Sequence, residues 1–293
     1  MTKPTMKELV PKFLDYIVYE QTMALRTARK YKDCLKWTLV HLPHVVFPEQ
    51  LAVEDITALK KLMIERHSGA SHVNSVVFAL RKFLSYCQDE LKLETISPKD
   101  LRPMKVPKRE VEFLRPEEIT QLLKFIDTKG IRGLRMRTLI EVLLSTGMRI
   151  SEALSLNRTD IDWDKKEAVI IGKGNKQRTI YFSHRSLGWI KKYLDRRKDT
   201  NIALFVAFGS TRRLTQYDLP KMFKYYTTLA GLKKKVTPHI LRHTMATLLL
   251  HNGCDITFIK ELLGHSEIET TARYYLGTDK QAVKAAHNKF LRF

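Results

Sequence analysis

The feature that most restricts the fold of this chain is a break in hydrophobic periodicity over residues 97–112. This segment, SPKDLRPMKVPKREVE, holds three prolines and five basic residues but few large apolar side chains. A proline cannot continue a helix, and a charged stretch of this kind has little to bury, so the pattern favours an extended linker. The chain is therefore predicted to form two domains, residues 1–96 and residues 113–293, joined by this basic linker.

The first domain is predicted to be a small bundle of four helices. Apolar side chains recur at helical spacing in four stretches that proline or glycine separates, namely residues 6–19, 24–41, 53–66 and 71–92. Short loops between consecutive helices place them side by side, as in a bundle. Basic residues such as Arg81 and Lys82 fit either a solvated helix face or a nucleic-acid surface, and the pattern alone leaves both readings open.

The second domain is predicted to be mainly helical with a small β-sheet. Residues 168–171 and 179–182 change to the composition of strands, and Gly172 to Lys176 between them predicts a hairpin turn with Lys173 near its tip. Helices are expected on both sides of this hairpin, over residues 116–130, 136–145, 148–156, 184–198, 216–230, 238–251, 255–263, 267–275 and 279–293. The predicted fold class is therefore mainly α with a small β-sheet.

The charge balance indicates a polyanionic partner. The chain has a formal net charge of +21, and both parts contribute: residues 1–106 hold 17 Lys and Arg against 12 Asp and Glu, and residues 107–293 hold 35 against 19. Solubility needs a net charge of only about 2–8 in a small domain, so nucleic acid is the natural inference.

No apolar run approaches the roughly 18 residues that span a bilayer, and the first residues lack the apolar segment of a secretory signal. We therefore expect a soluble, cytoplasmic protein with no membrane partner. When bound to DNA it would associate with the nucleoid.

Neither a metal nor a cofactor is predicted. Cys34, Cys87 and Cys254 are widely separated, which fits reduced thiols better than a disulfide framework or a zinc pair. His239 and His243 have the spacing of a zinc-binding helix, but the glutamate of H-E-x-x-H is missing. The glycine-flanked lysine of GKGNK lacks the spacing of a phosphate-binding P-loop.

Residues suited to phosphate chemistry concentrate between positions 237 and 275. His239 and Arg242 share a helix face at i, i+3, and Arg149 follows a helix that a glycine ends. Two arginines that converge on one phosphate can neutralise its non-bridging oxygens, because the planar guanidinium matches that geometry.

Tyr274 is a candidate nucleophile in the same segment, although a pair of tyrosines on a helix is more often part of a core. Its ordinary pKa of about 10 means that a neighbouring base must assist, and His239 and His265 are candidates for that base. Lys173 on its turn could donate a proton to a departing oxygen. Such a set would use positive charge and proton transfer in place of a metal.

Four motifs in order, TGMRISEALSL, IIGKGNKQRTI, TPHILRHTMATLLLHNG and ELLGHSEIETTARYY, resemble those of the tyrosine site-specific recombinases, the phage-integrase family. The resemblance is closest to the short Xer-like members and covers nearly the whole chain. It implies an N-terminal four-helix core-binding domain of the SAM-like type, and a mixed α/β catalytic domain with a C-terminal amphipathic helix.

The resemblance also implies a catalytic set and one supporting residue. The catalytic set is Arg149, Lys173, His239, Arg242, His265 and Tyr274, and the supporting residue is Glu152. In the family pattern, Arg149 and Arg242 bind the scissile phosphate, and Lys173 is the general acid for the 5′-hydroxyl leaving group. Tyr274 is the nucleophile, and the two histidines assist with proton transfer and phosphate contacts. The glutamate supports the arrangement of the site.

The partner that the resemblance implies is a double-stranded DNA target site. ALRTARKYKDCL matches the DNA-facing second helix of the core-binding domain, and the residues expected to contact DNA are Arg26, Arg29, Lys30, Lys32, Arg81, Lys176 and Arg178. The expected assembly is a homotetramer on two DNA sites that is a monomer or dimer when free. The expected reaction passes through a 3′-phosphotyrosine and a Holliday junction, in Xer-like resolution or in integration and excision of a mobile element.

Three departures from the family pattern accompany these matches. Tyr275 follows the predicted nucleophile where threonine is frequent, Leu276 occupies the position of a usual histidine, and Glu261 stands where many relatives have glutamine. Tyr275 is therefore an alternative nucleophile. Two other functions also stay open, a nicking-closing enzyme like a type IB topoisomerase and a non-catalytic DNA-binding regulator, although the intact catalytic set speaks against the regulator.

Overall fold

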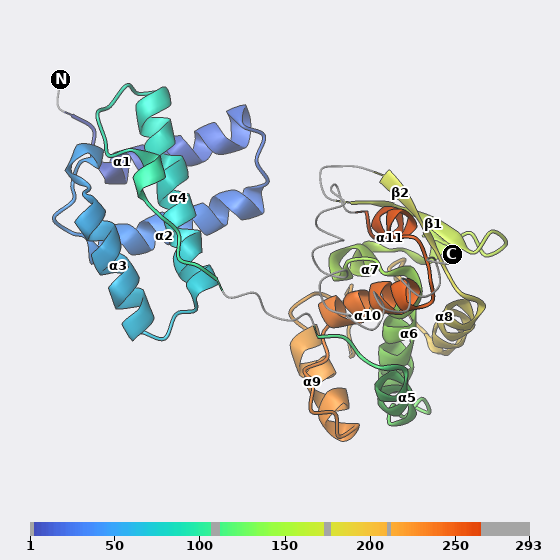
Figure 1. Cartoon of the computed structure of the whole chain (residues 1–293). Helices are drawn as coiled ribbons and strands as arrows, with labels where there is room; N and C mark the ends of the chain where they lie inside the picture. The colour runs from blue at the N-terminus through green and yellow to red at the C-terminus, as the bar shows by residue number, and fades with distance from the viewer. Residues whose placement is uncertain (1–2, 107–111, 173–176, 210–211, 265–293) are drawn as a thin grey trace, which may run out of the picture. The chain divides into compact units, whose positions relative to one another are not determined.

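The computed structural model describes residues 3–106, 112–172, 177–209 and 212–264. The chain divides into two compact units, Met1–Lys108 and Arg109–Phe293, and each has its own hydrophobic core (Figure 1). The fold is mainly helical with one small antiparallel sheet, which confirms the predicted fold class. Several predicted features lie outside the described residues, namely the hairpin tip and the two last helices, and with them Lys173, Lys176, His265, Tyr274 and Tyr275.

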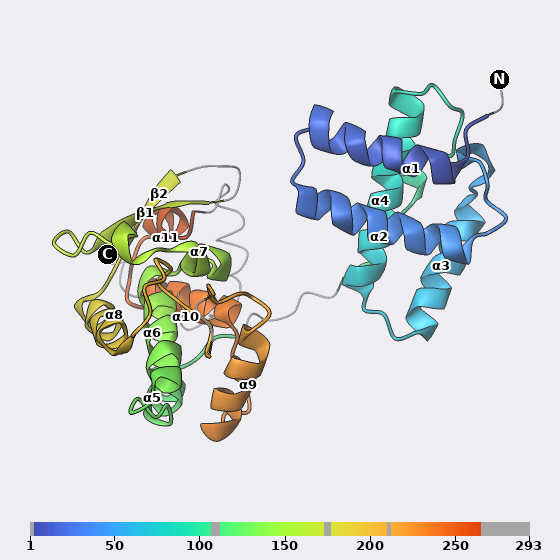
Figure 2. The same ribbon diagram turned by 180° about the vertical axis from the view of Figure 1, so that it is seen from behind.

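The first unit contains the four predicted helices, with bounds close to those that the periodicity indicates: α1 Met6–Asp15, α2 Leu25–His41, α3 Val53–Glu65 and α4 Ala70–Asp89. A π-helical turn, Tyr16–Glu20, continues α1. Helices α1 and α2 lie across α4 (Figure 2), and their apolar faces meet in a core around Phe13, Leu35 and Phe83. The charged residues between the apolar positions are left on the outer faces of the helices.

Residues 97–106 pack against the first unit, whereas the sequence pattern predicted that they begin an extended linker. Asn74 on α4 holds this segment by two hydrogen bonds with the backbone of Met104, at 2.9 and 2.7 Å. Leu101 is only 1% exposed and belongs to the core. One buried leucine and one asparagine do not produce a hydrophobic periodicity, so the sequence pattern does not indicate this packing. In the structure the first unit extends to Lys108.

The second unit surrounds a long central helix with shorter elements. Its described elements are α5 Pro116–Lys124, α6 Ile131–Thr146, α7 Ile150–Ser155, β1 Glu167–Ile171, β2 Gln177–Tyr181, α8 His184–Arg196, α9 Leu219–Leu229, α10 Pro238–His251 and α11 Ile256–Leu263. Helices α8 and α10 both pack against α6 (Figure 1). Strands β1 and β2 pair antiparallel, with Ile170 opposite Arg178. This confirms the predicted hairpin strands, shifted by one or two residues.

Helix α6 begins earlier than its apolar pattern indicates. The pattern predicted a start near residue 136 and placed Gly130 at the end of the preceding helix, whereas Gly130 directly precedes α6 and α5 ends at Lys124. The first turns of α6 contain Arg135, which is buried and donates from Nη1 to the carbonyl of Val206 at 2.7 Å. A buried arginine with a backbone partner breaks the apolar stripe without ending the helix.

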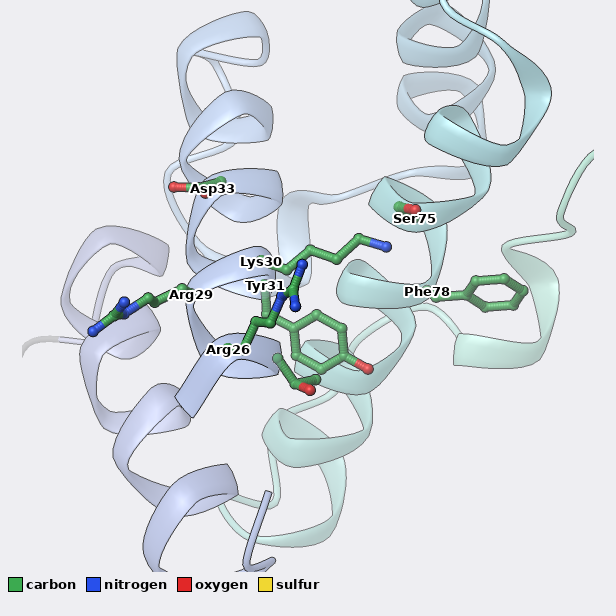
Figure 3. A pocket seen from close by; sticks show the side chains of 8 residues that line it. Arg26, Arg29, Lys30, Tyr31, Asp33, Ser75 and Phe78 are labelled. Carbon is green, nitrogen blue, oxygen red and sulfur yellow. The ribbon is translucent and has the colours of Figure 1, made fainter. Parts of the chain in front are cut away.

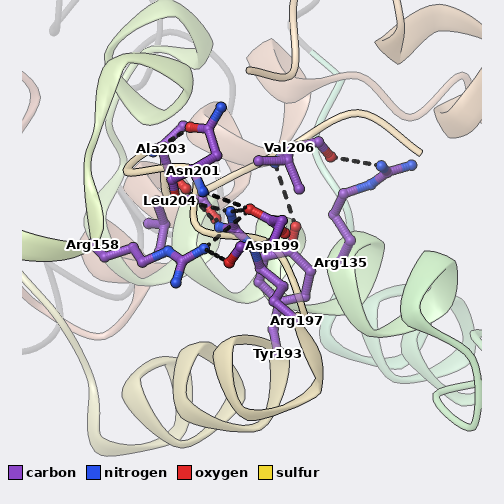
Figure 4. A network of polar contacts seen from close by, with 9 residues as sticks. All are labelled: Arg135, Arg158, Tyr193, Arg197, Asp199, Asn201, Ala203, Leu204 and Val206. Atoms are coloured by element: carbon purple, nitrogen blue, oxygen red, sulfur yellow. Dashed lines mark hydrogen bonds and ion pairs between the residues drawn. The ribbon is translucent and has the colours of Figure 1, made fainter. Parts of the chain in front are cut away.

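A polar network holds the loop between α8 and α9 (Figure 4). Arg197, whose side chain is 1% exposed, pairs with Asp199 and donates to the carbonyls of Ala203 and Leu204. Hydrogen bonds from Arg197 lower the pKa of Asp199 to about 2 although partial burial opposes this. The ionised pair of Arg197 and Asp199 thereby fixes this loop. A β-bridge between Ala203 and Asn157 connects the loop to the segment that follows α7.

The three cysteines are free thiols, and Cys34 and Cys87 are buried in the first unit. In the part of the chain that the structure describes, no helix combines the length and the apolar character needed to cross a membrane.

Candidate active site

Arg149 is positioned by a sharp turn between α6 and α7. Gly147 ends α6 with a φ of +58°, a left-handed conformation that favours glycine, and this turn brings Arg149 to the residue directly before α7. Glu152 accepts a hydrogen bond from the Arg149 backbone N–H at 2.7 Å and another from its Nη1 at 3.2 Å. The predicted i, i+3 pair is thus present, with the arginine at the helix start.

The opposite end of α7 is anchored as well. Arg213 donates from Nη1 to the carbonyls of Leu154, Ser155 and Leu156, each at 2.8 Å. These are carbonyls at a helix C-terminus, which lack partners within the helix and attract positive charge. The short helix that carries Arg149 is therefore held at both ends.

Glu152 binds a second arginine, which comes from the β-hairpin. Arg178 on β2 donates from Nη1 and Nη2 to the two carboxylate oxygens, at 3.0 and 2.7 Å. Burial by itself raises the pKa of Glu152, but hydrogen bonds from Arg178 and from the Arg149 backbone outweigh it, and the pKa lies below its ordinary value. Glu152 is therefore a buried carboxylate that stays ionised and holds two guanidinium groups.

Arg178, which the sequence analysis predicts to contact DNA, is engaged by Glu152 in the structure. Its side chain is only 13% exposed and is bound to Glu152. Side chains alternate between the two faces of a strand, so Arg178 shares the inward face of β2 with the buried Ile180. That alternation was readable in the sequence, and the inward direction of the arginine follows from it.

Arg242 on α10 is held by two backbone carbonyls. Nη1 donates to Gly147 at 2.7 Å and Nη2 donates to Leu263 at 2.6 Å, and the residue is 5% exposed. Both carbonyls lie at the C-terminal ends of helices, α6 and α11, where the helix dipole is negative. The burial of this charge is thereby compensated, and the guanidinium is fixed next to the turn that carries Arg149.

His239 lies one turn before His243 on α10, and their Nε2 atoms are 2.8 Å apart. One ring nitrogen must donate in this contact and the other must accept. Desolvation, and then the positive charges of Arg242 and Arg149, lower the pKa of His239, although the residue keeps an exposed surface. The sequence pattern indicates His239, but its contact with His243 is apparent only in the structure, because two histidines at i, i+4 by themselves are typical of a zinc-binding helix.

The described geometry thus brings Arg149, Arg242 and His239 into one region, with Glu152 in support. The described part of the site ends at Gly264, one residue before His265. Within the described ranges, no three His, Cys, Asp or Glu side chains lie where they could hold a metal ion. Two fixed positive charges beside a neutral imidazole can bind a phosphate and accept a proton.

Comparison with known proteins identifies the family of this site. Residues 112–281 match the Phage integrase family, and this match covers more than half of the chain. The chain belongs to the phage integrase family of tyrosine recombinases. A tyrosine recombinase XerD of Lacticaseibacillus casei is 32% identical over 294 residues, which cover 96% of this chain and 98% of that protein.

Solved structures of other recombinases have the same fold. XerA recombinase aligns at 26% identity with a TM-score of 0.55, covering 98% of this chain and 99% of that one. The Tn1549 transposon integrase, in complex with transposon right end DNA, aligns at 18% identity with a TM-score of 0.78, covering 97% and 99% of the two chains.

The first unit of this tyrosine recombinase carries a separate basic surface (Figure 3). A shallow pocket of about 730 Å³ lies between α2 and α4, and its lining includes Arg26, Arg29, Lys30, Tyr31 and Phe78. The three basic residues are exposed, and the aromatic ring of Phe78 is exposed as well. Arg26 and Lys30 extend from α2 toward α4, whereas Arg29 extends to the other side.

The other two predicted DNA contacts of the first unit lie outside this pocket lining. Lys32 is exposed on α2. Arg81 donates from Nε to the carbonyl of Pro98 at 2.8 Å and from Nη2 to that of Lys99 at 3.1 Å. Its guanidinium therefore holds residues 97–106 against α4, which is a structural role that the sequence did not indicate.

Proposed function

We propose that this tyrosine recombinase performs site-specific recombination of double-stranded DNA through a covalent 3′-phosphotyrosine. The observation that carries the proposal is the fixed pair Arg149 and Arg242 beside His239, whose lowered pKa keeps it neutral near pH 7. Groups that are held in place before the reaction stabilise developing charge without a cost for reorganisation. The integrase with a similar fold that was solved in complex with transposon DNA supports DNA as the substrate.

The proposed reaction is a transesterification at one DNA phosphate. The Oη atom of Tyr274 bonds to phosphorus, the bond from phosphorus to the 5′-oxygen breaks, and Lys173 supplies the proton that this oxygen takes up. The tyrosine proton passes to His239 or His265. One phosphoester is exchanged for another, so no ATP is consumed, and attack by a 5′-hydroxyl of a partner duplex completes the exchange through a Holliday junction.

The two units would divide the work on DNA. We assign binding of the core DNA site to the first unit and the reaction to the second. In the first unit, the exposed cations Arg26, Arg29 and Lys30 would contact DNA phosphates. The active assembly in this proposal is a homotetramer on two DNA sites, formed from monomers or dimers. Its place in the cell would be the cytoplasm, on the nucleoid when DNA is bound.

Trapping of the covalent intermediate tests the proposal. Wild-type protein is incubated with fragmented DNA of its source organism, denatured in SDS, and the attached DNA is sequenced to locate the target site. A nicked suicide duplex of that site should then give an SDS-resistant adduct with wild type and with Tyr275→Phe, but none with Tyr274→Phe. If Tyr275→Phe loses the adduct and Tyr274→Phe keeps it, the nucleophile is assigned one residue too early. An absence of any adduct with wild type contradicts the proposal.

A second assay separates recombination from simple nicking and closing. A plasmid with two copies of the mapped site should be resolved into two circles, and a supercoiled plasmid without the site should stay supercoiled. Relaxation of both plasmids with no exchange of DNA would instead support a topoisomerase-like enzyme. An enzyme that bound the site without any covalent adduct would support a regulator.

A further inference from the structure

The turn at the end of α11 touches both arginine systems of the active site. The carbonyl of Leu263 accepts from Arg242, and the next residue, Gly264, faces Arg178. A Cβ atom at Gly264 would lie 2.9 Å from both Cδ and Nη1 of Arg178. Gly264 also has a φ of +62°, so a side chain there would meet both backbone strain and the guanidinium.

Glu152 is the main anchor for the guanidinium of Arg178. The two hydrogen bonds to the carboxylate engage Nη1 and Nη2, while Nε is buried and has no hydrogen-bond partner among the described residues. With no second anchor among the described residues, the position of this guanidinium depends on the space around it. Gly264 provides that space, because any side chain there would overlap the position that the guanidinium occupies.

The charges of this cluster explain why a second arginine matters. Glu152 is buried and ionised, and its Oε1 accepts from Arg178 at 3.0 Å and from Arg149 at 3.2 Å. Without Arg178, the carboxylate would have one guanidinium for its full charge and would draw Arg149 toward itself. With Arg178 present, carboxylate and guanidinium neutralise each other, and the charge of the partly exposed Arg149 is left for a ligand.

We infer that Arg178 is a positioning residue for the proposed phosphoryl transfer: it satisfies Glu152, so that Arg149 can bind the scissile phosphate, and it depends on the missing side chain of Gly264. The inference rests on the proposed function and adds a residue to it. Arg178 needs no contact with DNA in this role. Its loss should therefore slow the reaction without weakening binding of the DNA site.

The test compares two DNA substrates in single-turnover formation of the covalent adduct. One has a natural phosphate at the mapped cleavage position, and the other has a methylphosphonate, in which a methyl group replaces one charged oxygen. Arg178→Ala should slow the natural substrate about 10- to 100-fold, by analogy with residues that orient the ligands of a catalytic metal and likewise act through another side chain. The methylphosphonate should show a clearly smaller loss, because it carries less negative charge for Arg149 to neutralise.

Four further variants, one of them a double variant and one a control, sharpen the comparison. Arg178→Lys keeps the charge but loses the forked geometry, and it should recover part of the rate. Gly264→Ala should slow the natural substrate, and the double variant with Arg178→Ala should be no slower than the slower single variant, since both changes break one contact. Arg158→Ala, in the polar network of Figure 4, is the matched control and should affect both substrates equally.

The outcomes separate this inference from the proposed function. An Arg178→Ala protein that keeps the wild-type rate, or loses the same factor on both substrates, overturns the inference while the proposed function stands. Wild type that forms no adduct on either substrate overturns both. Thermal unfolding identifies a variant that fails to fold, and Arg178→Lys with Gly264→Ala then gives the same comparison of the two substrates.

Discussion

Two groups of positive charge, one in each unit, are built in opposite ways. In the second unit, Arg242 is 5% exposed and its guanidinium is fixed by two carbonyls, and Arg178 is bound to a buried carboxylate. In the first unit, Arg26 and Lys30 are exposed at the edge of an open pocket. Fixed charges suit a reaction, where geometry determines the stabilisation of a transition state, and exposed charges suit affinity, where released counterions provide the driving force.

The largest effect is expected at the most firmly fixed charge. Arg242→Ala should lower the rate of adduct formation by about 10²–10³, the cost of losing one fixed donor to a developing negative charge. Affinity for the DNA site should change only a few-fold. Single-turnover cleavage and a binding titration measure the two quantities, and Arg242→Lys shows whether charge without the fork suffices. A loss of affinity as large as the loss of rate would break the distinction between the units.

The exposed cations should give the reverse result. Arg26→Ala together with Lys30→Ala should weaken DNA binding and reduce the slope of log K against log salt by about one for each lost phosphate contact. The rate of adduct formation at saturating protein should stay near that of wild type. Lys36→Ala, an exposed lysine of α2 outside the pocket, is the control and should have a smaller effect on affinity. An unchanged salt slope in the double variant would contradict this role.

A smaller effect is expected from His239, and it depends on pH. Its pKa in the folded state lies below the ordinary 6.5, so between these two values the unfolded chain binds more protons than the native state. The native state should therefore be most favoured above pH 6.5 and lose stability as the pH falls toward the lowered pKa. Urea unfolding of wild type and His239→Gln between pH 5 and 7.5 measures this, and the variant should lose less stability on acidification. Parallel pH profiles for the two proteins would contradict the lowered pKa.

The smallest effect, near zero, is expected from removing metal ions. Arg149 and Arg242 supply the positive charge that a cation supplies elsewhere, so a chelator should leave adduct formation unchanged. A magnesium-dependent endonuclease in the same mixture should lose its activity, which shows that chelation is complete. A loss of adduct that added magnesium restores would mean that the arginines do not suffice.

The sequence predicted most of the fold, because the helices and the hairpin bury regular apolar faces. Helix α10 begins at Pro238 and ends at His251, as the periodicity predicts, and Gly147 and Gly264 end the helices expected to end there. The same reasoning missed the early start of α6, where a buried arginine interrupts the stripe. Periodicity describes burial on average, and it cannot register a charged residue that finds a backbone partner.

For the described part of the candidate site, the sequence indicated residues but not their contacts. Motifs placed Arg149, Glu152, His239 and Arg242, and the structure brings these together. The pairing of Arg178 with Glu152 was not predicted, because the two residues are 26 positions apart. Contacts between distant segments depend on how elements pack, which local patterns do not encode.

The anchoring of Arg242 also has an evolutionary consequence. Among the described residues, Arg242 donates to main-chain carbonyls at Gly147 and Leu263, and every amino acid supplies a carbonyl. No substitution at those two positions can delete the acceptor, although a change of backbone path can displace it. Related chains that share a third or fewer of their residues with this one can therefore hold the same arginine in the same way, provided that the two helices end at the same positions.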